Sequence, residues 1–319
     1  MRVRLRAFWA TAPGQGEIRD EALETEAASH LVGRILASGV SRGTEALVMA
    51  GRVPASQYEA MRAPLMRGEF PFPLAYGYSA VGEVGGARVF ALHPHQDRFV
   101  APRIMCIPVP DTVPTARAVL AANMETALNI TWDAAPLAGE RMLVIGAGVV
   151  GLLVGSLLAP IPGAAVTVVD IDPTRARLAK HLGCTFTAPD CAPDRQDLIV
   201  HASGSEAGLR LALRSAAFEA RIVEASWFAD QYPALPLGEA FHARRLKLVS
   251  SQVGTVAAPM RARRSRTERL ALALDLLSNP AYDALLEGPT PFETLPEAMP
   301  RILAPGGLCH VISYGAEHV

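Results

Sequence analysis

Three glycines at fixed spacing, Gly146, Gly148 and Gly151, form the pattern in this chain that points most directly to chemistry. They lie between two apolar runs, as in the strand-to-helix turn that binds the pyrophosphate of a dinucleotide. The first glycine allows the tight turn, the second lets the backbone approach the phosphates, and the third lets the helix pack on the strand. Val149 and Val150 would begin that helix, whose first N–H groups face the phosphates. The pattern predicts a dinucleotide site.

Asp170 ends the next β-branched run, Val166–Val169, about 20 residues beyond the glycines, where an acid accepts the ribose hydroxyls of adenosine. We include its neighbour Ile171 in the predicted cofactor site. A carboxylate repels a 2′-phosphate, so Asp170 favours NAD over NADP. Arg175 and Arg177 follow and could instead rescue NADP binding, although such residues more often line the solvated face of a helix.

The apolar stretch from Met142 to Ala159 is also long enough for a membrane helix. The glycine spacing and the β-branched run that follows favour a buried parallel strand and its helix instead. The N-terminus has no apolar signal region, so we expect no signal peptide and no membrane partner.

The composition is that of a soluble enzyme: 319 residues, half of them hydrophobic, with a formal net charge of −1. This length allows two domains, and the balanced charge gives no indication of a nucleic-acid partner. The basic cluster Arg261–Arg266 lacks interleaved aromatics and is more typical of a solvated helix start. Four cysteines without a CxxC pair fit a reducing cytoplasm and exclude a cysteine-rich zinc lobe.

Short β-type runs broken by glycine and proline fill the chain to about Val113, and a helical pattern runs from Thr115 to Trp132. After Asp170, strands and helices alternate, which predicts an α/β fold with a doubly wound parallel sheet. The predicted elements there and beyond are Pro173–Leu182, Asp197–His201, Glu206–Ala217, Arg221–Ser226, Arg245–Val249, Thr267–Leu277, Leu295–Leu303 and Leu308–Ser313. The pattern changes after Gly254, so we expect this tail to return to the first domain.

The order of these parts resembles the medium-chain dehydrogenase/reductase superfamily over essentially the whole chain. The segment Ala37–Glu45 looks like the catalytic-metal loop of that family, with Ser41 where zinc members place Cys. Pro73–Gly82 looks like its second ligand segment, with Tyr78 in place of the ligand His. The third ligand position falls near Asn123–Thr126, which contains neither Cys nor Asp. The resemblance implies a GroES-like β-barrel catalytic domain, residues 1–117 and 255–319, around a Rossmann domain, residues 118–254.

Zinc in an open catalytic site needs three protein ligands from His, Cys or carboxylate, so the loss of all three positions together implies no zinc and no metal site. The structural-zinc loop of the family is cut here to Pro94–Arg98. Among zinc-lacking members, the two altered motifs look most like the hydroxyethyl-bacteriochlorophyllide dehydrogenase-like branch. By the same resemblance, Ser203 and Gly204 lie where the backbone passes the nicotinamide ribose, although they could form an ordinary turn.

The resemblance also places Ser41, Tyr78 and His93 toward the nicotinamide. The Tyr78 phenol could donate a proton to a developing alkoxide, and His93 could act as acid or base. Glu125 could be a buried acid near the nicotinamide. The alternatives are that Tyr78 fills the space left by zinc, that Glu125 pairs locally, and that His93 and His95 brace a turn or form a weak two-histidine metal site.

Together these features predict a cytoplasmic, zinc-independent, NAD-preferring oxidoreductase that interconverts a secondary alcohol and a ketone. One alternative is an NADPH-dependent quinone or enoyl reductase, and another is a dinucleotide-binding protein without turnover. The expected partner is a small-molecule substrate. The resemblance further implies a homodimer formed through the edge of the Rossmann sheet, for which Arg245–Val249 could supply the strand.

Overall fold

The computed structural model describes residues 1–315, which belong to two compact units. Unit 1 comprises Met1–Ala122 and the chain from Leu270 onward, and unit 2 comprises Asn123–Arg269. These boundaries lie later in the chain than the predicted ones at 117/118 and 254/255. The reason is that the chain passes from one unit to the other inside two helices, α3 (Ala121–Ala134) and α7 (Arg266–Leu276), and not at the turns that sequence patterns mark.

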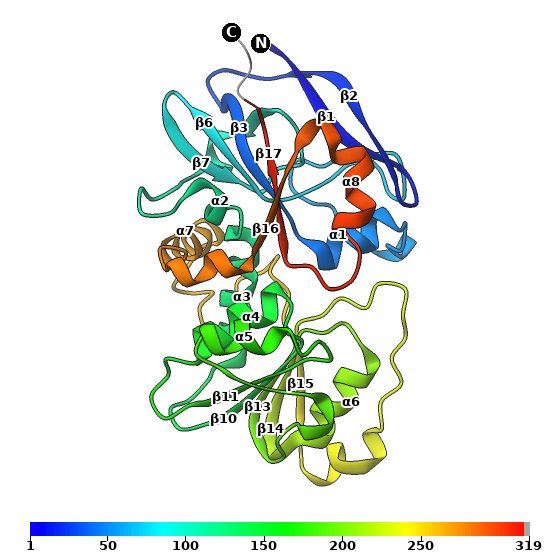
Figure 1. Cartoon of the computed structure of the whole chain (residues 1–319), viewed down its shortest axis with the longest axis vertical. Coiled ribbons are helices and arrows are strands. Elements are labelled where there is room, and N and C mark those ends of the chain that lie inside the picture. Colours follow the sequence, from blue (N-terminus) through cyan, green and yellow to red (C-terminus); the bar gives the residue numbers. More distant parts are fainter. Residues whose placement is uncertain (316–319) are drawn as a thin grey trace. The chain divides into compact units, whose positions relative to one another are not determined.

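Unit 1 contains two β-sheets and short helices (Figure 1). One sheet has the order β2-β1-β5-β4, and the other has the order β16-β17-β3-β6-β7-β9, with β8 paired to β3. The strands are β1 (Arg2–Ala12), β2 (Gln15–Glu24), β3 (His30–Val40), β4 (Arg67–Gly68), β5 (Leu74–Ala75), β6 (Ala80–Val84), β7 (Ala87–Ala91), β8 (Arg98–Pro102), β9 (Ile107–Pro108), β16 (Leu286–Pro291) and β17 (Cys309–Ser313). The helices other than α7 are α1 (Arg42–Met49), α2 (Thr115–Ala118) and α8 (Leu295–Ile302).

Glycines in these strands allow the sheet to pack closely on its own core. The ring of Phe99 is fully buried, and a Cβ on Gly82 would lie 2.4 Å from it. A Cβ on Gly33 would lie 1.9 Å from the carbonyl oxygen of Glu83 on the neighbouring strand. The sheet therefore needs glycine at both positions.

The late part of the chain completes this sheet. Strand β17 pairs antiparallel with β3, so that His310 faces Val40 and Ser313 faces Ala37, and β16 runs parallel to β17. The return of the tail to the first domain therefore occurs as strand pairing and not only as surface packing.

The single helix predicted from Thr115 to Trp132 is wrong in one respect, because the structure divides it into α2 and α3. The break at Val119 is associated with contacts from residues distant in the sequence. The Ser79 hydroxyl donates to the Val119 carbonyl oxygen, and Gly39 packs so closely on Val119 that a Cβ there would lie 2.9 Å from its side chain. The Ser79 hydroxyl therefore competes with backbone N–H groups for the Val119 carbonyl oxygen, which disfavours a continuous helix at this residue.

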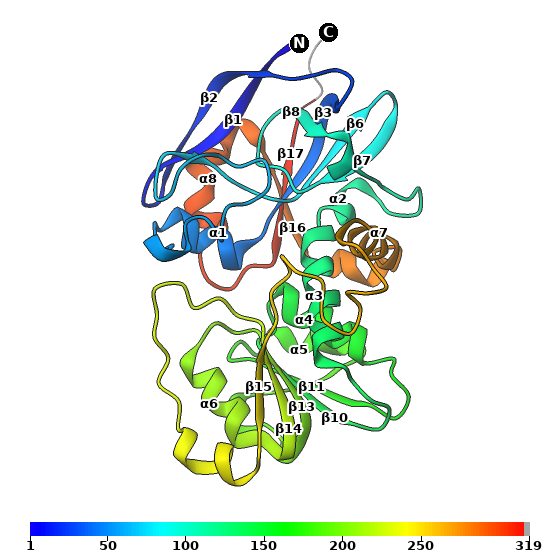
Figure 2. The ribbon, with the colours of Figure 1, turned by 180° about the vertical axis from the view of Figure 1, so that it is seen from behind.

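Unit 2 is a six-stranded parallel sheet of order β12-β11-β10-β13-β14-β15 (Figure 1). Its strands are β10 (Arg141–Ile145), β11 (Ala165–Val169), β12 (Thr185–Thr187), β13 (Gln196–His201), β14 (Ala216–Glu224) and β15 (Lys247–Ser250). Its helices besides α3 are α4 (Val149–Leu158), α5 (Arg175–His181) and α6 (Glu206–Ser215). Figure 2 shows β15 at the outer edge of this sheet beside β14.

The strongly apolar stretch that begins at Met142 is thus a buried strand, a turn and a helix. Met142, Leu143 and Val144 are fully buried in β10 between its parallel neighbours β11 and β13. Within residues 1–315, no helix combines the length and the apolar character needed to cross a membrane.

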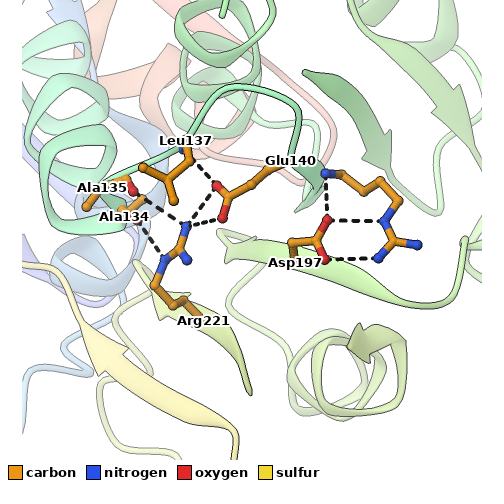
Figure 3. Close-up of polar contacts among 7 residues, drawn as sticks. Ala134, Ala135, Leu137, Glu140, Asp197 and Arg221 are labelled. Carbon is orange, nitrogen blue, oxygen red and sulfur yellow. Dashed lines mark hydrogen bonds and ion pairs between the residues drawn. The ribbon is translucent and has the colours of Figure 1, made fainter. Parts of the chain in front are cut away.

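The amino edge of the parallel sheet is held by ion pairs (Figure 3). Arg221 at the start of the regular part of β14 points to Glu140, with an N–O distance of 2.7 Å, and also donates to the Ala134 carbonyl oxygen. Asp197 accepts hydrogen bonds from the backbone and guanidinium of Arg141, which hold the pKa of that carboxyl below its usual range. These pairs stabilise the amino ends of the strands, whereas ligands of such sheets bind at the carboxyl ends.

Candidate functional site

The glycine turn of unit 2 has the geometry that a pyrophosphate-binding turn requires. Gly146 has a φ of +107°, in the region that favours glycine. A Cβ on Gly151 would lie 1.9 Å from the carbonyl oxygen of Gly146, so only glycine lets α4 start this close to β10. A Cβ on Gly148, in contrast, would meet no atom within 4 Å, so the turn is open on the side where α4 begins with Val149 and Val150.

Asp170 is fixed against this turn. Its two carboxylate oxygens accept hydrogen bonds from the backbone N–H groups of Ala147, at 2.6 Å, and of Asp172, at 2.8 Å. Each oxygen keeps a further lone pair for a ligand hydroxyl. The neighbouring Ile171 side chain is 88% exposed, so an apolar surface lies open next to the carboxylate.

A second group of polar residues lies at the carboxyl edge of β13 and β14. Gly204 has a φ of +63°, and its N–H donates to the Ser226 hydroxyl at 2.9 Å. The exposed Ser203 hydroxyl lies 2.6 Å from Nε2 of His201, and Nδ1 of that ring lies 2.7 Å from Oε2 of Glu224. The structure therefore connects the predicted Ser203 to two residues that the sequence analysis does not select.

A signal for His201 and Glu224 exists in the sequence. Each is the last residue of its strand and directly follows an apolar run, and the two face each other in the parallel register of β13 and β14. Because the carboxyl ends of parallel strands share one edge, polar residues in these places come together at the ligand-binding side.

In unit 1, Tyr78 lies beside the start of α1. Its hydroxyl hydrogen-bonds with the side chains of Ser41 and Thr44, and its ring meets that of Tyr76 edge-on at a centroid distance of 6.0 Å. Burial, reinforced by the Glu45 carboxylate, raises the pKa of Tyr78 to about 12, although the two hydrogen bonds act in the opposite direction. The phenol therefore stays protonated at neutral pH and is a hydrogen-bond donor.

His93 is placed differently from Tyr78 and Ser41. It is buried, its Nδ1 lies 2.9 Å from the Pro94 carbonyl oxygen, and its Nε2 lies 3.2 Å from backbone atoms of Val100. The ring stacks on Phe99 at 5.2 Å. Burial lowers the pKa of His93 to about 4. In this conformation both ring nitrogens contact backbone atoms. This is the arrangement expected if His93 stabilises a turn, the alternative to its role as an acid or base.

His95 belongs to a buried polar chain. Its Nε2 lies 3.0 Å from Oε2 of Glu45, and its Nδ1 shares a 2.8 Å hydrogen bond with the Ser38 hydroxyl, which also bonds to the Tyr314 hydroxyl. The other Glu45 oxygen accepts the backbone N–H of Ser41 at 2.7 Å. A cavity with room for about one water molecule borders Glu45 and His95. This chain holds the first turn of α1, and with it Ser41, in place.

Glu125 lies on α3 and belongs to unit 2. It accepts a 3.0 Å hydrogen bond from Nε of Arg269, which is only 2% exposed and also donates to Asn129 and to the carbonyl oxygens of Val253 and Thr255. Burial raises the pKa of Glu125, while Arg269 acts against that shift. The local pairing considered as the alternative for Glu125 is the arrangement present here.

The residues that the sequence resemblance places at metal-ligand positions offer few of the donor groups that zinc prefers. Ser41 and Tyr78 offer hydroxyl oxygens, the Asn123–Thr126 segment offers one carboxylate that Arg269 already engages, and zinc prefers His, Cys and carboxylate. Across residues 1–315, no three His, Cys, Asp or Glu side chains lie close enough together to hold a metal ion. The geometry of the glycine turn, in contrast, fits a dinucleotide.

Comparison of the sequence with known proteins gives a short local likeness. No family model matches the sequence. A segment of 85 residues is 39% identical to an L-threonine 3-dehydrogenase from Mesorhizobium japonicum, and it covers 26% of this chain and 24% of that protein. The sequence likeness to this curated relative therefore spans about a quarter of its length.

Solved structures match over almost the whole chain. L-idonate 5-dehydrogenase from Escherichia coli matches with a TM-score of 0.81 and 14% identity, covering 98% of this chain and 99% of that one. Acetophenone reductase from Geotrichum candidum, in complex with NAD, gives 0.76 and 16%, covering 97% of each. A protein from Sinorhizobium meliloti described as a zinc-binding dehydrogenase, bound to NADP, gives 0.76 and 15%, covering 98% and 99%. These likenesses confirm the predicted α/β fold, with a GroES-like domain and a Rossmann domain.

Proposed function

We propose that this chain is an NAD-preferring oxidoreductase of the medium-chain dehydrogenase/reductase superfamily that interconverts a secondary alcohol and a ketone. The observation that carries the proposal is the glycine turn, open at Gly148 and closed at Gly151, with Asp170 fixed beside it. The L-idonate 5-dehydrogenase and the acetophenone reductase among the structural neighbours support the reaction class. NAD, when bound, accepts or supplies the hydride.

The preference for NAD rests on charge around Asp170. A 2′-phosphate at the adenosine ribose would meet the Asp170 carboxylate. Arg175, the nearest candidate to neutralise such a phosphate, is buried and pairs with Asp172 at 3.2 Å. Arg177, two residues further along α5, is exposed and is the residue through which NADP binding could still occur.

In the proposed mechanism the reaction uses no catalytic zinc, because Ser41, Tyr78 and the segment Asn123–Thr126 do not supply the three His, Cys or carboxylate ligands that such a site needs. Tyr78 takes over the contact with the substrate oxygen. Its protonated phenol can donate a hydrogen bond to a carbonyl and then a proton to the alkoxide that forms. Ser41 and Thr44 orient the phenol through their hydrogen bonds, and the Glu45–His95 pair keeps Ser41 in place. His93 and Glu125 have bracing roles in this scheme.

We further propose that the protein is a cytoplasmic homodimer. The free thiols of all four cysteines agree with a reducing compartment. Strand β15 is a sheet edge with every residue exposed, including Leu248 and Val249. Such an edge can pair with the same edge of a second copy, because a two-fold interface is self-complementary.

The test is a titration of the purified, metal-analysed protein with NADH and with NADPH, followed by nicotinamide fluorescence. We expect tighter binding of NADH, and Asp170→Ala should reduce that preference by about tenfold, roughly the 1–2 kcal/mol of a charge-assisted contact. Asp20→Ala, which removes an exposed carboxylate on β2 of unit 1, is the control for the loss of one negative charge. Preference for NADPH would favour a quinone or enoyl reductase, and binding of neither would contradict the proposal.

Turnover of alcohol/ketone pairs after treatment with a chelator completes the test. Unchanged turnover is the expected result. Turnover that is lost and then restored by zinc would contradict the zinc-independent mechanism. Tight NADH binding without hydride exchange on any carbonyl would instead favour a dinucleotide-binding protein without turnover.

A further inference from the structure

Three side chains form a hydrogen-bonded relay at the carboxyl edge of the parallel sheet. Glu224 lies 2.7 Å from Nδ1 of His201, and Nε2 of the same ring lies 2.6 Å from the Ser203 hydroxyl. His201 is fully buried and Glu224 is mostly buried, whereas Ser203 is exposed. Ser203 is therefore the member of the relay that is most accessible to a ligand.

The surroundings hold the relay rigidly. The second Glu224 oxygen accepts the backbone N–H of Ser226 at 2.7 Å, and Phe228 stacks on the His201 ring at 6.1 Å. A Cβ on Gly208 would lie 2.4 Å from the Ser203 hydroxyl oxygen and 2.6 Å from His201 Nε2. Glycine at position 208 is thus what leaves room for the contact between Ser203 and His201.

The direction of each hydrogen bond follows from the chemistry of the groups. A carboxylate only accepts, so Nδ1 of His201 carries a hydrogen, and in the neutral ring Nε2 accepts the Ser203 hydrogen. The Ser205 hydroxyl lies 2.9 Å from that of Ser203 and also accepts the Gly208 N–H. Because the Ser203 hydrogen goes to Nε2, Ser205 is the donor between the two hydroxyls. Ser203 therefore has no hydrogen left to donate, and it presents an acceptor lone pair to solvent.

The exposed lone pair lies next to the glycine turn. A Cβ on Gly146 would lie 2.8 Å from the backbone nitrogen of Ser203. Strand β10, which leads into the turn, has β11 on one side and β13 on the other. Asp170 follows β11 and Ser203 follows β13, so the two residues flank the turn on opposite sides. A dinucleotide with its adenosine ribose at Asp170 would extend across the turn toward Ser203.

We propose that His201 and Glu224 are positioning residues that hold Ser203 as a hydrogen-bond acceptor for a hydroxyl of the second ribose of the cofactor. The inference rests on the proposed function, because it assumes that the glycine turn binds a dinucleotide. A serine–histidine–carboxylate chain could also suit a nucleophile. Covalent chemistry is not assigned here because the N–H that follows Ser203, that of Gly204, already donates to Ser226 and is not free to stabilise an oxyanion.

The experiment compares two ligands on the full chain by calorimetry. ADP-ribose carries the second ribose and ADP lacks it. Ser203→Ala should weaken ADP-ribose binding by about fivefold, as expected for one lost hydrogen bond, and leave ADP binding unchanged. Ser203→Thr, which keeps a hydroxyl, should retain ADP-ribose affinity. Ser156→Ala, a serine whose hydroxyl donates to the Leu153 carbonyl oxygen of its own helix, is the matched control.

The positioning role has its own readout. His201→Asn keeps an amide that can reach Glu224 but has no group at the Nε2 position, so it should weaken ADP-ribose as Ser203→Ala does. If the relay acts through Ser203, the double variant should bind ADP-ribose no more weakly than Ser203→Ala alone. Additive losses, or an equal loss of ADP and ADP-ribose in Ser203→Ala, would overturn the inference.

The two proposals fail in different ways. If the unaltered protein binds neither ADP, ADP-ribose nor NADH, the dinucleotide site itself is wrong, and the inference fails with it. If the unaltered protein binds all three and Ser203→Ala binds ADP-ribose with unchanged affinity, the cofactor site stands and only the relay is wrong.

Discussion

Among single residues, Tyr78 has the surroundings of a proton donor. We predict that Tyr78→Phe lowers turnover of the alcohol/ketone pair by about 10²–10⁴, the usual contribution of an acid–base group, without changing NADH affinity. The measurement is kcat together with NADH fluorescence titration. Because burial raises the pKa of Tyr78 to about 12, carbonyl reduction should show no loss from phenol ionisation up to about pH 11.

Tyr76→Phe is the matched control for this change. Tyr76 is a buried neighbour in ring contact with Tyr78 and has no assigned role with the substrate oxygen. Equal losses in the two variants would mean that the aromatic packing, and not the Tyr78 hydroxyl, determines turnover.

His93 should make stability depend on pH. Burial lowers its pKa from 6.5 to about 4, so between these values the unfolded chain binds a proton that the folded chain does not. The free energy of unfolding should therefore rise with pH in this window, by about 1.4 kcal/mol per pH unit. The contribution is complete above pH 6.5 and is lost as the pH falls toward 4.

Urea unfolding at pH 7.5 and at pH 5 measures this effect. His93→Gln should have a smaller difference between the two conditions than the unaltered protein, and His242→Gln, at an exposed position, should not. An unchanged difference in His93→Gln would show that the buried ring does not carry the pH dependence.

Residue patterns could predict the glycine turn and Asp170, because every requirement there is local in sequence. For His93 the sequence leaves a catalytic role and the bracing of a turn both open, because the contact with Val100 forms only once β8 is in place. The His95–Glu45 pair joins residues 50 positions apart and depends on how α1 packs against the loop that contains His95. Spacing cannot reveal contacts that only the tertiary fold creates.

At the scale of secondary structure, two glycines of the turn between β10 and α4 should have different roles, one in stability and the other in cofactor binding. Gly151→Ala places a methyl group 1.9 Å from the Gly146 carbonyl oxygen, so we expect a loss of about 1–3 kcal/mol or more in the free energy of unfolding. Gly148→Ala meets no atom within 4 Å and should leave the unfolding transition unchanged while weakening NADH binding.

Thermal unfolding and NADH titration of the two variants provide the comparison. Each variant acts as the control for the other, because both add one methyl group to the same turn. Full NADH affinity in Gly148→Ala would contradict the close approach of the phosphates to this backbone.

The predicted elements and the observed ones differ mainly at their ends. Strand β14 begins at Ala216, earlier than the predicted Arg221, because α6 ends at Ser215 and the chain enters the sheet directly. The division between α2 and α3 depends on a hydrogen bond from Ser79, about 40 residues earlier in the chain. The periodicity of hydrophobic residues identifies a helix or strand, but the residues at which that element begins and ends depend on its tertiary contacts.

For the molecule as a whole, the proposed dimer has a direct test. Val249→Lys places a charge on the exposed edge strand β15, and edge charges block strand pairing. Light scattering after size-exclusion chromatography should show a dimer for the unaltered protein and a monomer for this variant. Phe218→Lys changes an exposed apolar residue of β14 and should leave the dimer intact. A Val249→Lys dimer would place the interface elsewhere.

The antiparallel pairing of β17 with β3 has a consequence for synthesis on the ribosome. Strand β3 leaves the ribosome early, but its partner β17 is made only after the whole of unit 2. The backbone groups of β3 that later pair with β17 therefore stay unpaired with it while more than 200 residues are translated, at roughly 5–20 residues per second. Unit 2, whose sheet comes from one uninterrupted stretch of chain, can fold during that interval. The nascent chain would thus complete unit 2 before the sheet of unit 1 that contains β17, and an exposed β3 edge is where a chaperone would be needed.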